Sequence, residues 1–328
     1  MTVLFGASGI FRQEVFIIVK NIQPKIAIVG PPLQGLHDQL SAHEADVVSP
    51  GEHADGVIVT YGATPEQLQE ALDMSPNVRW VQLPTAGIEL FRNVIAADDA
   101  QDRVWTSAKG AYAEPVAEHA LLLTLALLRD MRSRVEARTW GKPAGRSLHG
   151  LRVLVVGAGG VAQEIIRLCK SFSTHVTAIR RRQGTVDGAD HTAYASDLFE
   201  VLPETDVVVL AAALTPDTKH MIDRAALSSM KSDAVLVNIG RGGLVDTDAL
   251  TVSLAEEQIY GAALDVTAPE PLPDGHPLWT EPRCIITPHT ADTMEMIIPL
   301  YLDRIDNNIR AIKQGDPFVG VVDAGAGY

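Results

Sequence analysis

Three closely spaced glycines, Gly157, Gly159 and Gly160, follow the apolar run at residues 151–156 and could hold a phosphate group. Gly157 permits a sharp turn from a strand into a helix, and Gly159 lets the backbone approach a pyrophosphate without an intervening Cβ. A helix that begins near Gly160 aims its N–H groups and the positive end of its dipole at the same phosphates. Ala162 replaces the last glycine of the usual G-x-G-x-x-G pattern, which the pattern allows. The spacing therefore predicts a dinucleotide-binding turn.

Two side chains that follow apolar runs could act on a small acid. Hydride transfer from a nicotinamide to a 2-oxo carbon needs a cation for the carboxylate and carbonyl, and a proton donor for the developing alkoxide. Arg241 suits the first task, because a planar guanidinium binds two oxygens at fixed geometry. His289 suits the second, because an imidazole exchanges protons near neutral pH. Taken alone, an arginine between glycines is more simply a solvated loop charge. The interpretation as a reaction site therefore rests on Arg241 and His289 occurring together after the glycine turn.

Short apolar runs alternate with helical patterns along most of the chain, which predicts parallel sheets covered by helices on both faces. The first series has its runs at residues 25–29, 46–48, 56–60, 80–83 and 104–106. The second series has six, at residues 151–156, 176–179, 207–210, 234–238, 261–265 and 284–287. Because the glycine turn lies in the second series, that series is expected to form a six-stranded nucleotide-binding domain. The expected fold class is α/β, with two doubly wound parallel-sheet domains.

Two long helical patterns connect these series. Residues 114–131 are predicted to form one apolar helix, followed by a looser arm at residues 132–150 that contains Trp140. Residues 295–313 are predicted to form a helix that returns to the first domain. We therefore expect a substrate domain at residues 1–116 and 294–328 and a dinucleotide-binding domain at residues 117–293. The active site is expected in the cleft between them, at the strand ends.

Composition narrows the choice of partners and location. The chain has 328 residues, 46% of them hydrophobic, and a net charge of −14, which argues against a nucleic-acid partner. The most apolar run, residues 120–128, is too short to span a bilayer, and the N-terminus lacks a signal-peptide pattern. Cys169 and Cys284 lack metal-ligand spacing and are expected to be buried reduced thiols, with no metal site. These features favour a cytoplasmic protein without a membrane partner.

Three motifs in the second half of the chain carry a resemblance to a known family. They are N-I-G-R-G-G-L-V-D at residues 238–246, L-D-V-T-A-P-E-P-L at 264–272 followed by H-P-L-W at 276–279, and T-P-H at 287–289. In this order, after the glycine turn, they resemble the D-isomer-specific 2-hydroxyacid dehydrogenase family from about residue 76 onward. The resemblance implies a Rossmann dinucleotide-binding domain beside a discontinuous, flavodoxin-like substrate domain.

The resemblance also implies roles for individual residues. Glu270 would stabilise the imidazolium of His289, which with Arg241 completes the candidate catalytic set. Ala86 and Gly87, which could otherwise form an ordinary turn, would offer backbone N–H groups to the substrate carboxylate beside Arg241 and His289. Asp265 would lie near the nicotinamide carboxamide, although it could merely cap a helix. The other expected cofactor contacts are Gly157, Gly159, Gly160, Val161, Arg180, Arg181, Pro216, Ile239 and Gly240.

The residues after the second strand of the nucleotide series bear on the choice of cofactor. An NAD enzyme usually has an Asp or Glu there to receive the ribose 2′-OH, whereas this chain has three arginines at residues 180–182. A 2′-phosphate would be attracted by such guanidinium groups. We therefore predict a preference for NADP(H), with NAD(H) still usable, and Arg180 and Arg181 as the contacts. A solvated basic loop is the simpler alternative.

The resulting hypothesis is an NAD(P)-dependent D-2-hydroxyacid dehydrogenase that reduces small, glyoxylate- or hydroxypyruvate-like 2-oxo acids. One alternative is a formate or phosphite dehydrogenase on the same scaffold, which is disfavoured because formate oxidation needs no proton donor. Another is a nicotinamide-sensing, corepressor-like binding protein, although nothing in the chain resembles a peptide-docking or nuclear targeting segment. The apolar crossing helix and the Trp140 arm also predict a two-fold homodimer.

Overall fold

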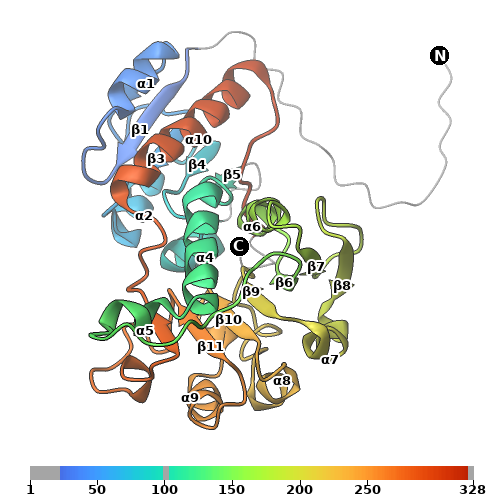
Figure 1. Ribbon diagram of the computed structural model, residues 1–328. Helices are drawn as coiled ribbons and strands as arrows, with labels where there is room; N and C mark the ends of the chain where they lie inside the picture. Colours follow the sequence, from blue (N-terminus) through green and yellow to red (C-terminus); the bar gives the residue numbers. More distant parts are fainter. Residues whose placement is uncertain (1–22, 99–102, 324–328) are drawn as a thin grey trace, which may run out of the picture.

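The computed structural model describes residues 23–98 and 103–323, and its strands form two parallel sheets (Figure 1). In the described residues the smaller sheet has the order β2-β1-β3-β4-β5 and the larger the order β12-β11-β10-β9-β6-β7-β8. These are a flavodoxin-like order and a Rossmann order extended by β12. The expected α/β fold with two doubly wound parallel sheets is therefore confirmed.

The strands of the smaller sheet are β1 Lys25–Val29, β2 Asp46–Val48, β3 Gly56–Val59, β4 Trp80–Gln82 and β5 Val104–Thr106. Those of the larger sheet are β6 Arg152–Val156, β7 His175–Arg180, β8 His191–Tyr194, β9 Val207–Leu210, β10 Val235–Asn238, β11 Gly261–Leu264 and β12 Cys284–Ile286. Each of these strands pairs with its neighbours in parallel.

The expected count of six strands in the nucleotide-binding sheet was wrong, because β8 adds a seventh within the described residues. This strand pairs only with β7 at the edge of the sheet, and Ala193 is its only buried residue. An edge strand with one buried side chain has neither a continuous apolar run nor a clear alternation. By contrast, all four residues of β9 and of β10 are buried, as expected for strands covered on both faces.

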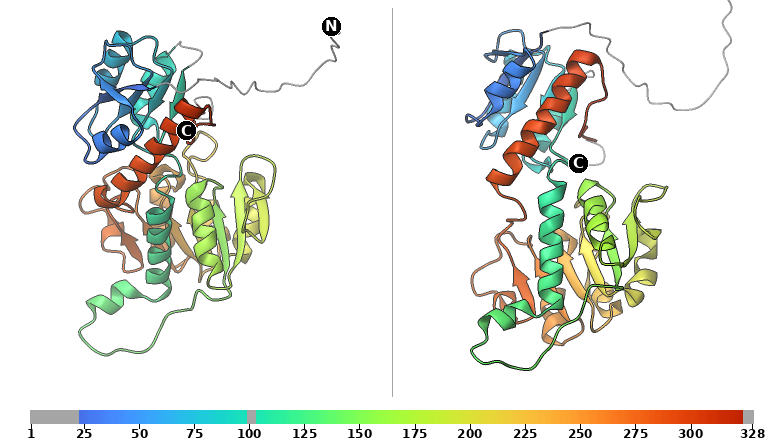
Figure 2. Two further views of the ribbon diagram at one scale, coloured as in Figure 1. Left: turned by 90° about the horizontal axis from the view of Figure 1, so that it is seen from above. Right: turned by 45° about the horizontal axis from the view of Figure 1, so that its top comes forward.

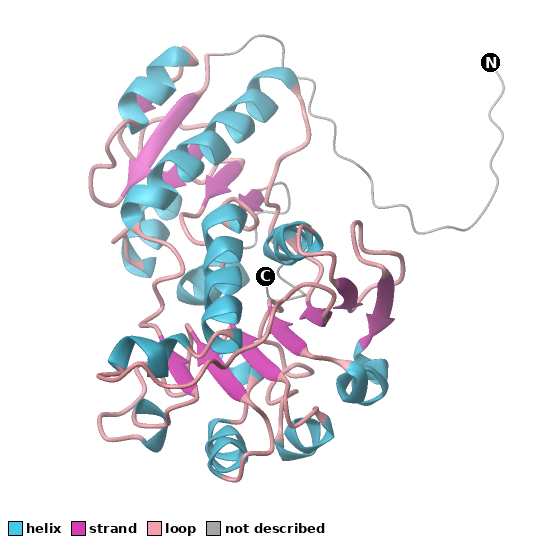
Figure 3. Cartoon of the chain, viewed as in Figure 1, coloured by secondary structure: helices cyan, strands magenta, loops and turns pink. Residues whose placement is uncertain are grey.

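Helices cover both faces of the larger sheet (Figure 3). One face carries α4 Ala113–Leu128 and α6 Gly160–Lys170, whose buried side chains form one apolar core with the strands. The other carries α7 Leu198–Val201, α8 Arg224–Ser229 and α9 Thr247–Ala255 over a second core. The short 3₁₀ helices are η1 Glu89–Phe91, η2 Ala195–Asp197, η3 Leu202–Glu204, η4 Gly242–Leu244 and η5 Pro277–Trp279.

The smaller sheet is enclosed in the same way. Helices α2 Pro65–Met74 and α3 Arg92–Ala97 pack on one face, and α1 Leu36–Ala42 and α10 Met294–Gln314 pack on the other. Helix α10 therefore returns to the first sheet, as the sequence predicted (Figures 1 and 2). The hydroxyl of its fully buried Tyr301 donates to the carbonyl of Val59 at 2.6 Å.

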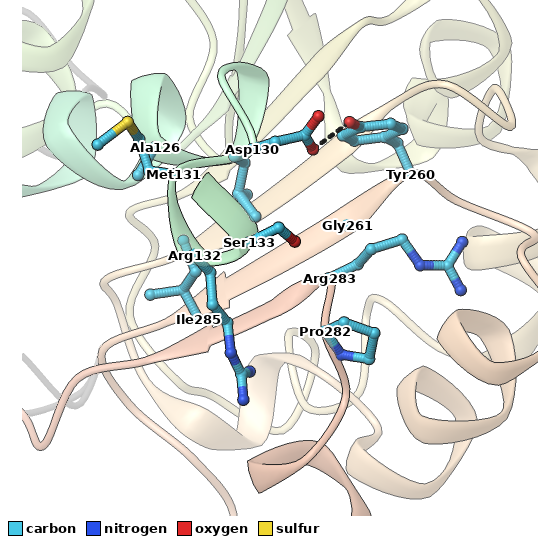
Figure 4. Close-up of a pocket in the computed structure, with 11 residues that line it drawn as sticks. Ala126, Asp130, Met131, Arg132, Ser133, Tyr260, Gly261, Pro282, Arg283 and Ile285 are labelled. Atoms are coloured by element: carbon cyan, nitrogen blue, oxygen red, sulfur yellow. Dashed lines mark hydrogen bonds between the residues drawn. The ribbon is translucent and has the colours of Figure 1, made fainter. Parts of the chain in front are cut away.

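The long helix expected at residues 114–131 is interrupted. Helix α4 ends at Leu128, Asp130 has a left-handed backbone with a φ of 51°, and α5 Met131–Glu136 runs in a new direction. The hydroxyl of Tyr260 donates to the Asp130 carboxylate across a small pocket at this junction (Figure 4). Residues 137–149, which follow α5, contain no helix or strand.

The chain passes between the two sheets at residues 107–112 and 287–293. The predicted domain boundaries fall within α4 and immediately before α10, while residues 1–22 and 324–328 of the predicted substrate domain lie outside the described residues. Within the described residues, no helix combines the length and the apolar character needed to cross a membrane.

Candidate active site

The candidate residues of the second series lie at one edge of the larger sheet, because parallel strands all end on the same side. Gly157 follows β6, Arg180 ends β7, Pro216 lies in the loop after β9, Arg241 follows β10, Asp265 follows β11 and His289 follows β12. This edge faces the loops of the smaller sheet that carry Ala86 and Gly87, since Gly87 lies against Arg241. The topology therefore gathers residues that are far apart in the sequence.

The glycine turn has the geometry that a pyrophosphate needs. Gly157 has a φ of 132°, and a Cβ there would lie 2.6 Å from the carbonyl oxygen of Ala211. Apart from Gly159 and its two chain neighbours, no described residue places a heavy atom within 4 Å of the position that a Cβ on Gly159 would take. Helix α6 begins at Gly160 without a side-chain cap among the described residues, so its first N–H groups can receive an anion. The turn fits a dinucleotide, with the half-buried Val161 beside it.

The arginines after β7 differ in their surroundings. Nη1 of Arg180 donates to the carbonyl of Thr185 at 2.6 Å, and its Nε is buried without a hydrogen-bond partner among the described residues. Arg181 is exposed, and Arg182 forms an ion pair with Asp323 at 3.1 Å. The guanidinium of Arg180 thus folds partly onto its own loop. Contact of Arg180 or Arg181 with a cofactor stays a prediction.

His289 and Glu270 meet at the edge of the sheet. Nδ1 of His289 lies 2.6 Å from Oε1 of Glu270, and both side chains are about half exposed. The backbone of His289 is left-handed, with a φ of 49°, and its N–H donates to the carbonyl of Asp265 at 2.8 Å. Because Glu270 engages Nδ1, Nε2 is the nitrogen through which the histidine can exchange a proton with a substrate.

Hydrogen bonds to the Asp265 carboxylate stabilise the turn that carries His289. This buried carboxylate accepts hydrogen bonds from Thr287 Oγ1 at 2.6 Å and from the N–H groups of residues 290–291 at 2.9 and 3.1 Å, and His119 Nε2 lies 3.3 Å away. Burial raises the pKa of Asp265, but the hydrogen bonds from His119, Thr287 and residue 290 outweigh it, so the pKa falls below its ordinary value. Asp265 therefore caps a turn rather than a helix, and its expected contact with the nicotinamide stays a prediction.

Arg241 bridges the two domains. Its Nε donates to Oε1 of Glu89 at 2.9 Å, and its Nη1 donates to the carbonyl of Gly240 at 2.8 Å. A Cβ on Gly87 would overlap both the Arg241 guanidinium and the Glu89 carboxylate. Gly87 thus gives the two side chains room to pair in this position. The sequence did not point to Glu89, because its partner lies 152 residues away.

The loops that carry Arg241 and Glu270 pack directly together. A Cβ on Gly242 would overlap the carbonyl group of Thr267, so only glycine allows this approach. The hydroxyl of Thr247 donates to the carbonyl of Ala268 at 2.7 Å, and the N–H of Thr267 donates to Oε2 of Glu270 at 3.3 Å. The side chains that could bind and protonate a substrate therefore lie on two loops that contact and hydrogen-bond each other.

Two tyrosines that the sequence did not single out hydrogen-bond the start of the loop that carries Ala86 and Gly87. The hydroxyls of Tyr61 and Tyr112 donate to the carbonyl of Pro84 at 2.8 and 2.6 Å. Burial raises the pKa of both tyrosines well above the ordinary value, so both remain O–H donors. Ala86 itself is exposed.

The remaining predicted cofactor residues lie along the same edge. Pro216 is exposed in the turn after β9. The side chain of Ile239 is buried in the core, and the N–H of Gly240 donates to the side-chain oxygen of Asn238 at 3.1 Å. No group of three or more His, Cys, Asp or Glu side chains in the described part of the chain could hold a metal ion.

Comparisons with known proteins agree with this arrangement. Residues 119–291 match the family described as D-isomer specific 2-hydroxyacid dehydrogenase, NAD binding domain. The chain is 38% identical over 263 residues (78% of this chain, 86% of the relative) to an uncharacterized protein in the proB 3′ region of Corynebacterium melassecola. It is 31% identical over 270 residues (79% and 83%) to glyoxylate/hydroxypyruvate reductase B of Pectobacterium carotovorum subsp. carotovorum (strain PC1). Its fold matches the TT0316 protein of Thermus thermophilus with a TM-score of 0.71 and 27% identity, covering 91% of this chain and 100% of that one.

Proposed function

Because the chain belongs to the D-isomer-specific 2-hydroxyacid dehydrogenase family, we propose that it reduces small 2-oxo acids to D-2-hydroxy acids. Membership makes it an NAD(P)-dependent oxidoreductase. The proposed substrates are glyoxylate, hydroxypyruvate and acids of similar size. The name of the Pectobacterium relative, glyoxylate/hydroxypyruvate reductase B, supports this choice.

The observation that carries the proposal is the 2.6 Å contact between Glu270 and His289 on the loops that adjoin Arg241. Reduction of a 2-oxo acid adds one hydride to the carbonyl carbon and one proton to the carbonyl oxygen. The bound cofactor supplies the hydride. Nε2 of His289 donates the proton, and the negative charge of Glu270 stabilises the imidazolium before transfer.

Arg241 binds the substrate carboxylate and polarises the carbonyl. Its Nη groups carry the hydrogen-bond donors for this task, and the Ala86–Gly87 backbone completes the site from the other domain. Since Asp265 and Gly242 hold the turn and the loop in place, the donors are positioned before the substrate arrives, which lowers the cost of orienting it.

The cofactor is proposed to be NADP(H) in preference to NAD(H). The support is the sequence at the end of β7, where residues 180–182 are all arginine and no carboxylate is present to receive a ribose 2′-OH. Arg181 is exposed and can reach a 2′-phosphate, whereas Arg180 also donates to the carbonyl of Thr185.

The assembly is proposed to be a two-fold homodimer formed through α5 and residues 137–149. The part of this segment around Trp140 extends from the larger domain as an irregular loop (Figure 2), and the chain returns to the domain where Arg146 pairs with Asp233 and Leu148 is buried. Trp140 is 99% exposed and Val135 is 71% exposed. Apolar side chains so fully exposed favour a covering partner, and a second copy would supply the same segment by symmetry.

The proposal is tested by steady-state assays with glyoxylate, hydroxypyruvate, pyruvate and phenylpyruvate, each with NADPH and with NADH. Chiral chromatography of the product identifies the D isomer. Failure of the wild-type protein to reduce any of these acids with either cofactor would refute the proposed function.

His289→Asn tests the proposed proton donor. We expect kcat for reduction to fall by roughly two to four orders of magnitude, the usual share of general acid catalysis. Cofactor binding, measured by fluorescence titration, should be retained. His191→Asn, on the exposed edge strand β8, is the matched control. A His289→Asn enzyme with near wild-type kcat would remove His289 from the mechanism.

A further inference from the structure

Glu89 places a carboxylate in the candidate site that no step of the proposed reaction uses. It is the first residue of η1, directly after the loop of Ala86 and Gly87. Its Oε1 accepts from Nε of Arg241 at 2.9 Å, and the two side chains are 54% and 35% exposed respectively. An anion thus stands beside the cation that is to bind the substrate.

The position of this carboxylate is well determined by its surroundings. The side chains of Ile88 and Phe91, on either side of it, are buried in the core of the smaller sheet. Gly87 leaves the space that the Glu89 carboxylate and the Arg241 guanidinium occupy. Because η1 is packed in this way, Glu89 is presented to the site by a rigid element and not by a free loop.

The ion pair also keeps Glu89 charged. Burial raises the pKa of Glu89, but the hydrogen bond and positive charge of Arg241, together with the charge of Arg92, outweigh it and lower the pKa below its ordinary value. Glu89 is therefore an anion throughout the neutral range.

The negative charge of Glu89 acts differently on monocarboxylate and dicarboxylate substrates. Glu89 occupies the Nε side of the Arg241 guanidinium, and Nη1 donates one hydrogen bond to the carbonyl of Gly240, which leaves the other Nη hydrogens to bind a substrate carboxylate. A 2-oxo acid with one carboxylate meets the cation there. A second carboxylate on the same substrate would lie close to Glu89 and be repelled, whereas a hydroxyl on C3 could donate a hydrogen bond to it.

We propose that Glu89 is a specificity-determining residue that selects 2-oxo monocarboxylates, above all those with a hydroxyl on C3, against 2-oxo dicarboxylates. This inference rests on the proposed reduction of 2-oxo acids. It assigns the discrimination to the Glu89–Arg241 pair, in which each domain contributes one charge.

The test compares kcat/KM for glyoxylate, hydroxypyruvate and oxaloacetate in the wild type, Glu89→Gln and Glu89→Asp. In Glu89→Gln the ratio of oxaloacetate to glyoxylate should rise by about tenfold or more, equivalent to about 1.4 kcal/mol. The ratio of hydroxypyruvate to glyoxylate should fall, because an amide is the weaker acceptor. Glu89→Asp keeps the charge and should retain the preference for the monocarboxylates.

Controls separate this inference from its alternatives. Glu66→Gln removes an exposed charge on α2, outside the candidate site, and should leave all ratios unchanged. Glu89→Ala gives a second neutral variant if Glu89→Gln folds poorly. An equal change of kcat/KM for all three acids would show that Glu89 only links the domains, and would overturn the proposal. A wild type that reduces none of the acids refutes the proposed function itself, whereas an active wild type with unchanged ratios in the variants refutes only this inference.

Discussion

Glu270 lies 2.6 Å from Nδ1 of His289, and this contact fixes the ring so that Nε2 is the nitrogen left to face a substrate. Glu270→Gln keeps a side chain of similar size and replaces the carboxylate with a neutral amide. A hydrogen bond to a charged group contributes about 1.5–3 kcal/mol. We therefore expect kcat for reduction to fall by about tenfold or more, at about 1.4 kcal/mol per tenfold.

This loss is measured as kcat for glyoxylate reduction at neutral pH. Glu256→Gln, at an exposed position after α9, should leave kcat unchanged. An unchanged kcat in Glu270→Gln would mean that the carboxylate does not support proton donation by His289.

Asp265→Asn should destabilise the turn that carries His289. The carboxylate is buried and accepts at least three hydrogen bonds. A hydrogen bond to a charged group contributes about 1.5–3 kcal/mol to stability. We expect a loss of about 2 kcal/mol at neutral pH, seen as a fall of about 4–8 °C in the thermal midpoint of a domain of this size.

The pH dependence of this loss follows from the pKa of Asp265, which lies below its ordinary value in the folded protein. The contribution of the carboxylate to stability is present above the ordinary aspartate pKa and is lost as the pH falls through the lower folded value. The wild type and Asp265→Asn should thus differ most at neutral pH and converge in acid. Equal thermal midpoints at neutral pH would contradict the structural role of Asp265.

At the scale of elements, we predict that the residues at the end of β7 set the cofactor preference. The proposed contacts of Arg180 and Arg181 with a 2′-phosphate should favour NADPH over NADH by about ten- to a hundredfold in kcat/KM, at about 1.4 kcal/mol per tenfold. Arg181→Asp should reduce this ratio, because it removes an exposed guanidinium from the proposed 2′-phosphate contact. Arg180→Asp should reduce it as well and also lower the thermal midpoint, since Arg180 supports Thr185.

The comparison needs a control for total charge. Arg224→Asp, at the exposed start of α8, makes the same change away from β7 and should keep the preference. A wild-type enzyme that favours NADH would show that the three arginines do not select a 2′-phosphate.

At the scale of the whole molecule, the segment after α4 should join two copies of the chain. Arg132 anchors the start of this segment by donating to the carbonyls of Glu281 at 2.6 Å and Trp279 at 2.8 Å. The segment beyond it exposes Val135 and Trp140. Light scattering at micromolar concentration should give twice the chain mass of 35.2 kDa, and Trp140→Glu should shift the population toward monomer. A monomeric mass for the wild type would exclude this assembly.

Much of this protein could be read from its sequence, because the patterns involved are local. The apolar runs of β6, β9 and β10 predicted buried parallel strands, since such strands are covered on both faces. The glycine turn predicted where a helix N-terminus would meet a phosphate. The order of the motifs around residues 241, 270 and 289 predicted the family and its cofactor class.

Other features depended on contacts between residues distant in the sequence, and only the tertiary structure decided them. Edge strand β8 is held by pairing with β7 and not by its own apolar pattern. At the break between α4 and α5, Asp130 accepts a hydrogen bond from Tyr260, 130 residues further on. Asp265 fastens the His289 turn, and Glu89 pairs with Arg241 across two domains. Local periodicity records which side of an element is buried, but which side chains meet at the sheet edge is set by how the two sheets pack together.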